Sequence, residues 1–376
     1  MAVLKIFPDK DATLYSLFPN MNTGLDEIVE ATLTTFAYSD PNPQTSRFLI
    51  NFNNDDILEA IDLIPQSTYD SGSWNAKLQC FIATATGLSV TTSIDCLPVA
   101  QYWDMGTGRY LDEPISTDGC SWIWAGYSGS TVWSAPVGAT SSYTSSVPAG
   151  GGVWYTGSQY SSSVTFSYRT DKDINLNVTN IVDAWFPSAS RSPVFSNNGF
   201  LLKQRVEFID NKNYQPELKY FSVDTNTIYP PALQISWNDF VFNTGSSTQT
   251  ILNTLPATIT LAQNPGVFYS ESINRFRINA RPEYPVQLWQ TESVYLNNYY
   301  LPTASYWALK DLETNEYIID FDSTYTKLSA DSTSSYFDLH MNFLQPERYY
   351  AILIQSTING STVVFDDQYY FKVING

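Results

Sequence analysis

Short runs of β-branched and aromatic residues, separated by turn residues, recur along the whole chain. Runs of about four to eight such residues, bounded by Gly, Pro, Asn or Asp, are typical of β-strands. We therefore predict strands at residues 12–15, 47–52, 77–85, 164–168, 199–208, 233–237, 258–262, 275–280, 305–309, 317–321, 336–341, 349–356 and 363–373.

Helical patterns are few. Residues 55–64 (DDILEAIDLI) place apolar side chains at helical spacing after two acidic residues, which predicts one or two helical turns. The pattern of residues 178–185 predicts another short helical turn. Neither segment is long enough to define the fold, so the predicted fold class is all-β.

Two segments carry the sharpest local signals. In residues 175–203 a short alternating strand is followed by a bend at Trp185, a polar loop, and a second strand that opens at Asn198-Gly199. This order predicts an antiparallel β-sandwich edge within one local segment. Near the end of the chain, Asn359-Gly360 separates two strand patterns, which is a strong β-hairpin signal. Tyr349 and Tyr350 on one strand should then lie across from Tyr369, Tyr370 and Phe371 on the other, near the open end of the hairpin.

The length of 376 residues predicts more than one domain. The polar segment 238–254 is the best boundary, so we expect an N-terminal antiparallel, jelly-roll-like β-sandwich at residues 1–240. Residues 241–376 would form one or two smaller β-sandwich domains, for which an immunoglobulin-like arrangement is one form. A Ser-, Gly- and Tyr-rich insert at about residues 126–163 carries tryptophans, which favours a surface loop packed on its own domain or on a neighbour.

The charge of the chain excludes several partners. A formal net charge of −18 offers no basic stripe for nucleic acid and disfavours an anionic membrane surface. No window approaches 18 uninterrupted apolar residues, and residues 1–10 lack the apolar run of a signal peptide. The three cysteines have no short-spaced pair, which favours buried reduced thiols in a protein assembled in cytosol.

Catalytic patterns are weak. The single histidine, His340, lies in an alternating strand pattern without a nucleophile motif beside it, so we expect a structural role. The loop Gly106-Thr107-Gly108 is expected to be a plain turn. The adjacent acid pairs at residues 55–56, 112–113 and 366–367 would diverge on a strand or face solvent on a turn. We therefore predict that the protein is not an enzyme and has no catalytic residues.

Two oxygen-rich segments could bind a metal ion. Residues 51–56 (NFNNDD) and 210–213 (DNKN) offer amide and carboxylate oxygens of the kind that Ca²⁺ prefers, but neither has the spacing of a known calcium loop. Ordinary turn chemistry is the expected explanation. We predict no cofactor, with Ca²⁺ as the alternative.

Aromatic residues supply the candidate contact surface. Trp103, Trp122, Trp124, Trp133 and Trp154 lie in the loop-rich middle, where rings could stack on sugars, anchor another protein or pack in the core. Of these, Trp154 is expected to be exposed, whereas Trp185 is expected in the core. The candidate contact residues are Trp133, Trp154, Tyr155, Tyr160, Tyr349 and Tyr369.

About two thirds of the chain, residues 1 to about 240, resembles the DNRLRE-type β-sandwich domains, which have a carbohydrate-binding-module-like fold. The resemblance is carried, in chain order, by residues 11–15, 22–24 and 28–30, by 46–52, by 178–185 with 198–203, and by 220–222 with 230–233. The insert before Val164 is larger than the family pattern. The acidic motif that names the family is not cleanly present near Val223-Asp224.

The chain also resembles structural proteins of tailed phages, notably at residues 7–13 and 344–350. This implies a non-enzymatic virion protein of the neck, tail, baseplate or capsid surface, assembled in the host cytoplasm. It would act through contacts with other virion proteins, as a symmetric homo-oligomer or in many copies.

The sequence is also consistent with two other functions. A glycan-binding module that attaches to a host-surface polysaccharide is the main alternative, and a polysaccharide-degrading enzyme is the third. The final hairpin and the insert around residues 133–160 are the candidate contact regions, so deleting residues 138–152 should leave the fold intact and weaken incorporation into particles.

Overall fold

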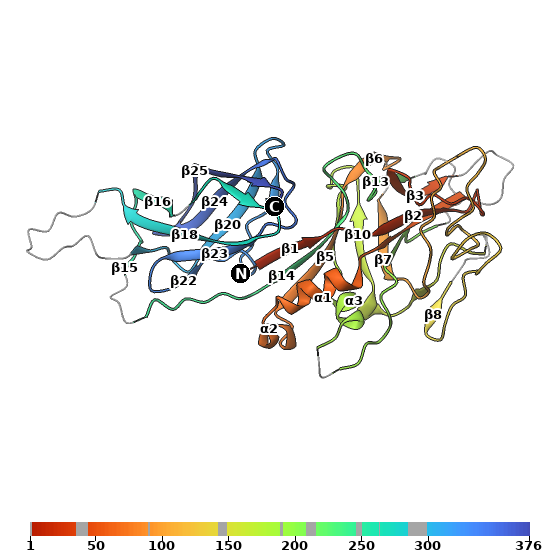
Figure 1. The fold of residues 1–376 in the computed structure, drawn as a ribbon, viewed down its shortest axis with the longest axis horizontal. Coiled ribbons are helices and arrows are strands. Elements are labelled where there is room, and N and C mark those ends of the chain that lie inside the picture. The colour runs from red at the N-terminus through yellow and green to blue at the C-terminus, as the bar shows by residue number, and fades with distance from the viewer. Residues whose placement is uncertain are drawn as a thin grey trace, which may run out of the picture. The chain divides into compact units, whose positions relative to one another are not determined.

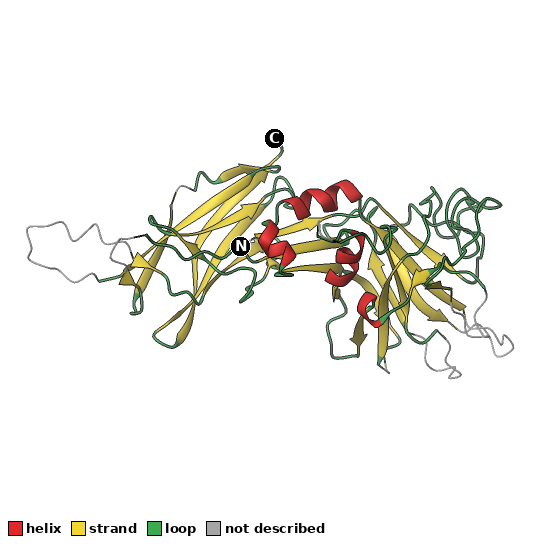
Figure 2. Cartoon of the chain, turned by 90° about the horizontal axis from the view of Figure 1, so that it is seen from below, coloured by secondary structure: helices red, strands yellow, loops and turns green. Residues whose placement is uncertain are grey.

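The computed structural model describes residues 2–34, 44–88, 91–141, 149–188, 191–207, 216–245, 250–262, 264–284 and 299–376. Strands dominate these residues and helices are short, which confirms the all-β prediction (Figures 1 and 2). Most strand pairs are antiparallel; β15–β19 and β17–β25 are parallel, and the bounds of these strands are given below. No helix in the described ranges is long and apolar enough to cross a membrane.

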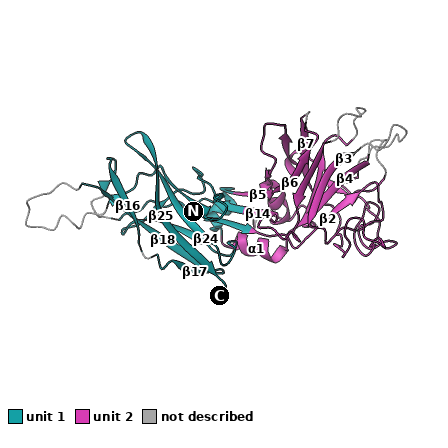
Figure 3. Cartoon of the chain, turned by 90° about the horizontal axis from the view of Figure 1, so that it is seen from above, with its two compact units in different colours: residues 1–5, 64–74, 235–376 teal, residues 6–63, 75–234 magenta. Residues whose placement is uncertain are grey.

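The chain forms two compact units, coloured separately in Figure 3. Unit 2 comprises residues 6–63 and 75–234, and unit 1 comprises residues 1–5, 64–74 and 235–376. Strands β1 (Ala2–Ile6), β5 (Trp74–Cys80) and β14 (Ala232–Trp237) carry the chain from one unit to the other. The chain passes into unit 1 for the last time at Ile235, just before the polar segment 238–254.

Unit 2 is built on a large antiparallel sheet with the strand order β10-β7-β12-β4-β3-β13-β6, and β2 pairs with β4. A shorter antiparallel pair joins β11 to β5. The strands that complete the unit are β2 (Lys10–Tyr15), β3 (Ile28–Thr34), β4 (Gln44–Asn51), β6 (Ile82–Thr86), β7 (Thr92–Pro98), β8 (Ala139–Thr140), β9 (Trp154–Tyr155), β10 (Ser162–Phe166), β11 (Ile174–Asn177), β12 (Phe200–Gln204) and β13 (Glu217–Phe221).

The short helices of unit 2 lie where the sequence predicts them. α1 (Asn54–Asp62) is capped by Asn53, whose side chain accepts a hydrogen bond from the Asp55 N–H, and Asp55 and Asp56 lie in its first turn. α3 (Thr179–Trp185) buries Trp185 in the core, as expected. A single 3₁₀ turn, η1 (Ser158–Tyr160), follows the insert.

Two local strand predictions are corrected. Residues 77–85 form two strands rather than one, because the chain leaves β5 at Phe81 and continues as β6 in the large sheet beside β13. β12 is an inner strand between β4 and β7, not a sandwich edge. The strand that follows Asn198-Gly199 therefore stands near the centre of the unit.

A buried asparagine joins the loop after β2 to the loop near residue 106. The Asn22 amide donates to the Met105 and Cys120 carbonyls at 2.6 and 2.9 Å, and its oxygen accepts from the Gly24 and Gly108 N–H groups. The Gly-x-Gly segment predicted as a plain turn is thus packed around the Asn22 side chain.

All three cysteines are buried and form no disulfide bond with one another, which confirms the prediction of buried reduced thiols.

Unit 1 is a sandwich of two sheets. One has the order β15-β19-β18-β23-β22 with β16 paired to β18, and the other has the order β17-β25-β24-β20-β21. The elements are α2 (Gln66–Asp70), β15 (Thr250–Ile251), β16 (Ala257–Ala262), β17 (Val267–Tyr269), β18 (Ile273–Pro282), β19 (Tyr299–Tyr300), β20 (Ser305–Asp311), β21 (Tyr317–Ile319), β22 (Ser329–Ala330), β23 (Ser335–His340), β24 (Tyr349–Ile358) and β25 (Ser361–Ile374).

Aromatic rings hold these two sheets together. Phe337 on β23 stacks on Trp307 of β20 with ring centroids 4.6 Å apart, and Phe276 on β18 lies 5.5 Å from Phe371 of β25. Since each pair joins one sheet to the other, the apolar faces of the two sheets pack against each other as in a β-sandwich.

The final hairpin confirms its sequence signal. Ile358 pairs with Ser361, and Asn359 and Gly360 both have positive φ, as a type I′ turn requires. At the open end Tyr350 lies opposite Phe371, and the rings are 5.9 Å apart. The predicted pairing of aromatic residues across the two strands is therefore confirmed.

Candidate functional site

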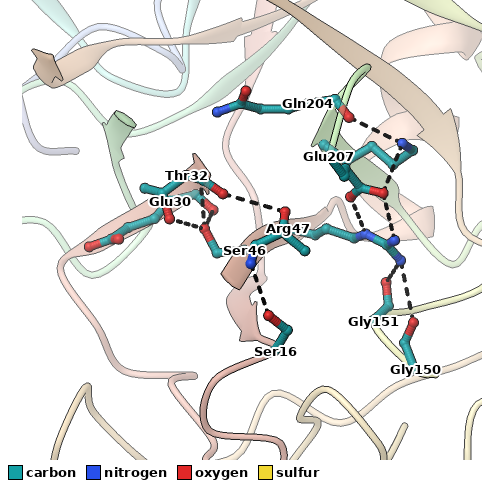
Figure 4. A network of polar contacts seen from close by, with 11 residues as sticks. Ser16, Glu30, Thr32, Ser46, Arg47, Gly150, Gly151, Gln204 and Glu207 are labelled. Carbon is teal, nitrogen blue, oxygen red and sulfur yellow. Dashed lines mark hydrogen bonds and ion pairs between the residues drawn. The ribbon is translucent and has the colours of Figure 1, made fainter. Parts of the chain in front are cut away.

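Arg47, on the inner strand β4, is fully buried in unit 2. Its guanidinium donates to both carboxylate oxygens of Glu207 at 2.6 and 2.8 Å, a bidentate arrangement that fixes both side chains (Figure 4). It also donates to the carbonyl of Gly151 at 2.7 Å and, at 3.4 Å, to that of Gly150. One buried cation thereby ties the insert to the sheet.

Two tryptophan rings enclose the same guanidinium. Its central carbon lies 4.9 Å from the Trp122 ring centroid and 5.1 Å from that of Trp154. Both rings belong to a buried cluster that also contains Trp103 and Leu201. Charge–ring attraction in a desolvated setting adds to the hydrogen bonds and makes this the best-defined polar centre of unit 2.

A second cation completes the cluster. Lys203 on β12 lies 3.3 Å from Glu207 and 5.7 Å from the Trp154 ring. Burial lowers the pKa of Lys203, and the Glu207 charge opposes that effect. Burial alone would raise the pKa of Glu207, but the charge and hydrogen bonds of Arg47, with those of Lys203, hold it below its usual value. Glu207 is therefore ionised at neutral pH.

A polar pocket of about 330 Å³ lies beside this cluster on the large sheet. Arg205 and Asp95 form an ion pair at 2.7 Å at its wall, and both side chains are partly exposed. The lining residues come from β7, β8, β9, β10 and β12 and from the loops next to them: Asp95, Leu97, Thr140, Trp154, Thr156, Gly157, Ser161, Ser163, Lys203 and Arg205. The pocket thus offers several hydroxyl groups and charges of both signs, beside the buried ring of Trp154.

The predicted contact residue Trp154 is buried, with 4% of its surface exposed, so the prediction that it is exposed is wrong. The reason is the run Gly150-Gly151-Gly152, which lets the backbone approach closely and brings the ring against Arg47. Trp133 is half-buried, packs on the same cluster and donates its ring N–H to the Ser121 carbonyl at 2.9 Å. Neither ring is free to serve as an exposed anchor.

Tyr155 and Tyr160 share one partner. Tyr155 stacks on Phe195 with centroids 4.4 Å apart, and Tyr160 meets the same ring edge-on at 5.1 Å. Both tyrosines keep part of their surface exposed. They form a small aromatic cluster at the end of the insert.

The remaining predicted contact residues lie on the final hairpin. Tyr349 is exposed and lies 6.3 Å, ring to ring, from exposed Tyr370. Tyr369 points the other way, into the sandwich, where its hydroxyl donates to the Ile259 carbonyl at 2.7 Å. Only the first two belong to an outward surface.

The other middle tryptophans are also placed in the core. Trp103 and Trp122 are fully buried, so the alternative in which their rings stack on sugars is wrong. Trp103 donates its ring N–H to the Asn198 carbonyl at 2.9 Å. Trp124 is half-buried, and its ring N–H donates to the Asn20 side chain.

His340 is buried in unit 1 and meets Trp237 edge-on at 5.7 Å. Burial lowers the pKa of this histidine, so it is neutral at physiological pH.

The oxygen-rich segment 51–56 contributes its side chains to helix α1 and its surroundings. Asn53 caps the helix, and the Asn54 side chain accepts a hydrogen bond from Asn197. The other predicted calcium segment, residues 210–213, lies outside the described residues.

No protein-family model matches the chain, and no curated protein matches it. Among solved structures, a DUF4785 family protein from Legionella pneumophila aligns with 99% of this chain at 6% sequence identity and a TM-score of 0.17. The alignment covers 62% of that protein, so this chain spans less than two thirds of its length.

Proposed function

We propose that the protein is a non-enzymatic structural component of a tailed-phage particle, in its neck, tail, baseplate or capsid surface. It would act by binding other virion proteins, in symmetric copies, with residues 1–240 as a DNRLRE-like sandwich. The observation that supports this best is an outward aromatic face on the C-terminal sheet of unit 1.

The pairing of β17, β25 and β24 defines that face. Tyr349 lies opposite Lys372, which in turn lies opposite Val267. Paired residues, and alternate residues along each strand, point to one side of a sheet. The aromatic face consists of partly or fully exposed side chains: Val267, Tyr269, Tyr349, Tyr370, Lys372 and Ile374.

The chemistry of the aromatic face suits protein contact. Tyrosines are enriched at protein interfaces because each ring buries much area while its hydroxyl still finds a hydrogen-bond partner. Grouped exposed apolar side chains on a soluble protein mark interaction sites more often than isolated ones do.

The double variant Tyr349→Ser/Tyr370→Ser is expected to fold normally and to lose at least about tenfold in incorporation into particles, since two central aromatic anchors typically contribute more than 1 kcal/mol each. Incorporation is measured by quantitative mass spectrometry of purified particles. Tyr168→Ser, at an exposed tyrosine in unit 2, is the matched control and should incorporate normally. Equal incorporation of wild type and double variant would contradict the proposal.

The pocket beside Arg205 favours a second candidate function, attachment to a host-surface polysaccharide. Hydroxyl groups of Thr140, Ser161 and Ser163 and the charged groups of Arg205 and Asp95 could bind sugar hydroxyls. Since the ring of Trp154 is buried, binding would depend on these polar side chains rather than on stacking against an exposed ring.

If this candidate is correct, Arg205→Ala is expected to abolish retardation of the protein in gels that contain the polysaccharide. Arg191→Ala is the matched control, because Arg191 also forms an exposed ion pair, with Asp183. Two results would contradict a glycan site in this pocket. Either the wild type is not retarded by the polysaccharide, or the wild type and Arg205→Ala are retarded equally.

A further inference from the structure

The floor of the pocket beside Arg205 is one row of side chains on the large sheet. Ser163 on β10 lies directly opposite Asp95 on β7, and Asp95 in turn lies opposite Lys203 on β12. Residues that pair in this way point to the same side of a sheet, and Arg205 follows two positions after Lys203. All four residues line the pocket, so Asp95 lies between a hydroxyl group and two cations.

Each cation that lines the pocket already contacts a carboxylate. Arg205 donates through Nε and Nη2 to Asp95, and the shortest of these distances is 2.7 Å. Lys203 lies 3.3 Å from Glu207 and also donates to the Gln204 carbonyl at 3.1 Å. An anionic ligand would therefore have to displace one of these carboxylates or bind next to Asp95, which would repel it.

The ion pair of Asp95 and Arg205 keeps hydrogen-bonding capacity for a neutral ligand. Arginine carries five N–H donors, and the Nη1 group of Arg205 has no partner within the described part of the chain. The Oδ2 of Asp95 accepts only the Nε group there, at 3.3 Å, so it can accept a further hydrogen bond. Two hydroxyl groups on adjacent carbons match such a pair, because one can donate to Oδ2 while the other accepts from Nη1.

The rest of the pocket lining also suits a ligand rich in hydroxyl groups. The side chains of Thr140, Thr156 and Ser163 line the pocket and have no hydrogen-bond partner among the described residues. A hydroxyl group both donates and accepts, so each of these can bind a sugar hydroxyl in either direction. The volume of about 330 Å³ is at the small end of the range for small-molecule sites, about 300–1,000 Å³, which suits one sugar unit.

We propose that this pocket binds one neutral sugar unit through two hydroxyl groups on adjacent carbons, with the ion pair of Asp95 and Arg205 at its centre. This inference rests on the second candidate function, attachment to a polysaccharide, and adds the class of polysaccharide that is bound. The charge of the chain supports the same choice, since a formal net charge of −18 repels an acidic polymer. A neutral polysaccharide meets no such repulsion, and it can bind without displacing a carboxylate.

The test is electrophoresis of the full chain in native gels that contain a neutral polysaccharide (dextran, galactomannan or mannan) or an acidic one (alginate or polygalacturonate), each compared with a gel without polymer. We expect at least one neutral polymer to retard the wild type and neither acidic polymer to do so. Asp95→Asn should bind the neutral polymer at least about tenfold more weakly, because the site loses an ionised acceptor. The same variant should gain retardation by the acidic polymers, since Arg205 is then no longer paired with a carboxylate.

Asp183→Asn is the matched control, because Asp183 also pairs with an exposed arginine, Arg191, and its substitution changes the net charge equally. This control should migrate as the wild type does in every polymer. Retardation of the wild type by acidic polymers, alone or as strongly as by neutral ones, would overturn the neutral-sugar proposal and leave polysaccharide attachment standing. Retardation by no polymer would overturn both. Equal retardation of the wild type and Asp95→Asn by a neutral polymer would overturn the proposal by showing that the sugar binds outside this pocket.

Discussion

Replacing Arg47 with Met is expected to lower the free energy of unfolding by about 3–5 kcal/mol. The substitution leaves the Glu207 carboxylate in a nearly dry site and removes the donor to the Gly151 carbonyl. Lys203, which stays 3.3 Å from Glu207, should keep the loss toward the lower end of that range. Chemical denaturation followed by tryptophan fluorescence measures the change, since two of the rings flank the guanidinium.

Two further variants make this result specific. Arg191→Met removes an exposed ion pair with Asp183 and should cost less than about 1 kcal/mol. The double variant Arg47→Met/Glu207→Leu should be more stable than Arg47→Met alone, because it no longer buries an uncompensated charge. If Arg47→Met costs no more than Arg191→Met, the buried cluster does not hold the insert to the sheet.

The parts of the fold that follow from the sequence are those with local signals. Asn359-Gly360 predicts its hairpin because a type I′ turn needs two residues that accept positive φ, and no distant contact has to be known. The apolar spacing and the acidic start of residues 55–64 predict α1 for the same reason. Alternating apolar residues likewise identify most of the strands.

Pairings between distant segments do not follow from such signals. Residues 77–85 form one continuous β pattern, yet the chain divides at Phe81 because β5 pairs with β11 and β6 pairs with β13. The parallel pairing of β17 with β25 joins segments about 100 residues apart. The hydrophobic pattern of a strand shows which faces are buried, and it does not show which neighbour lies beside it.

The buried cluster was missed for a related reason. The sequence predicts a strand at residues 47–52, but an arginine within a strand pattern usually indicates an exposed position. Its partner Glu207 lies 160 residues away, so only the folded chain brings the two charges together. The Ser- and Gly-rich composition around Trp154 favoured an exposed ring, whereas the glycines in fact permit its burial.

These contacts also change the expectation for the insert. Deleting residues 138–152 would remove the two carbonyls that accept from Arg47 and would displace Trp154 from the core. We therefore expect the deletion to unfold unit 2 rather than to leave the fold intact. A pair of single substitutions in the insert can test this without deleting any of the chain.

Gly151→Ala is expected to destabilise the protein by about 1–3 kcal/mol more than Gly138→Ala does. Both glycines have positive φ, so both substitutions carry a similar backbone cost of about 1–2 kcal/mol. An added Cβ at Gly151 would lie 2.7 Å from the Trp122 ring and 2.8 Å from the Arg47 guanidinium, whereas one at Gly138 would meet nothing within 4 Å.

The difference between the two unfolding free energies therefore isolates the packing of the insert against the buried cluster. It is measured by chemical denaturation of both variants under one set of conditions. Equal losses would mean that Gly151 has room to move, that the insert is only loosely held, and that its deletion could be tolerated after all. A larger loss at Gly151 would make the glycine run a structural requirement for burying Trp154 beside Arg47.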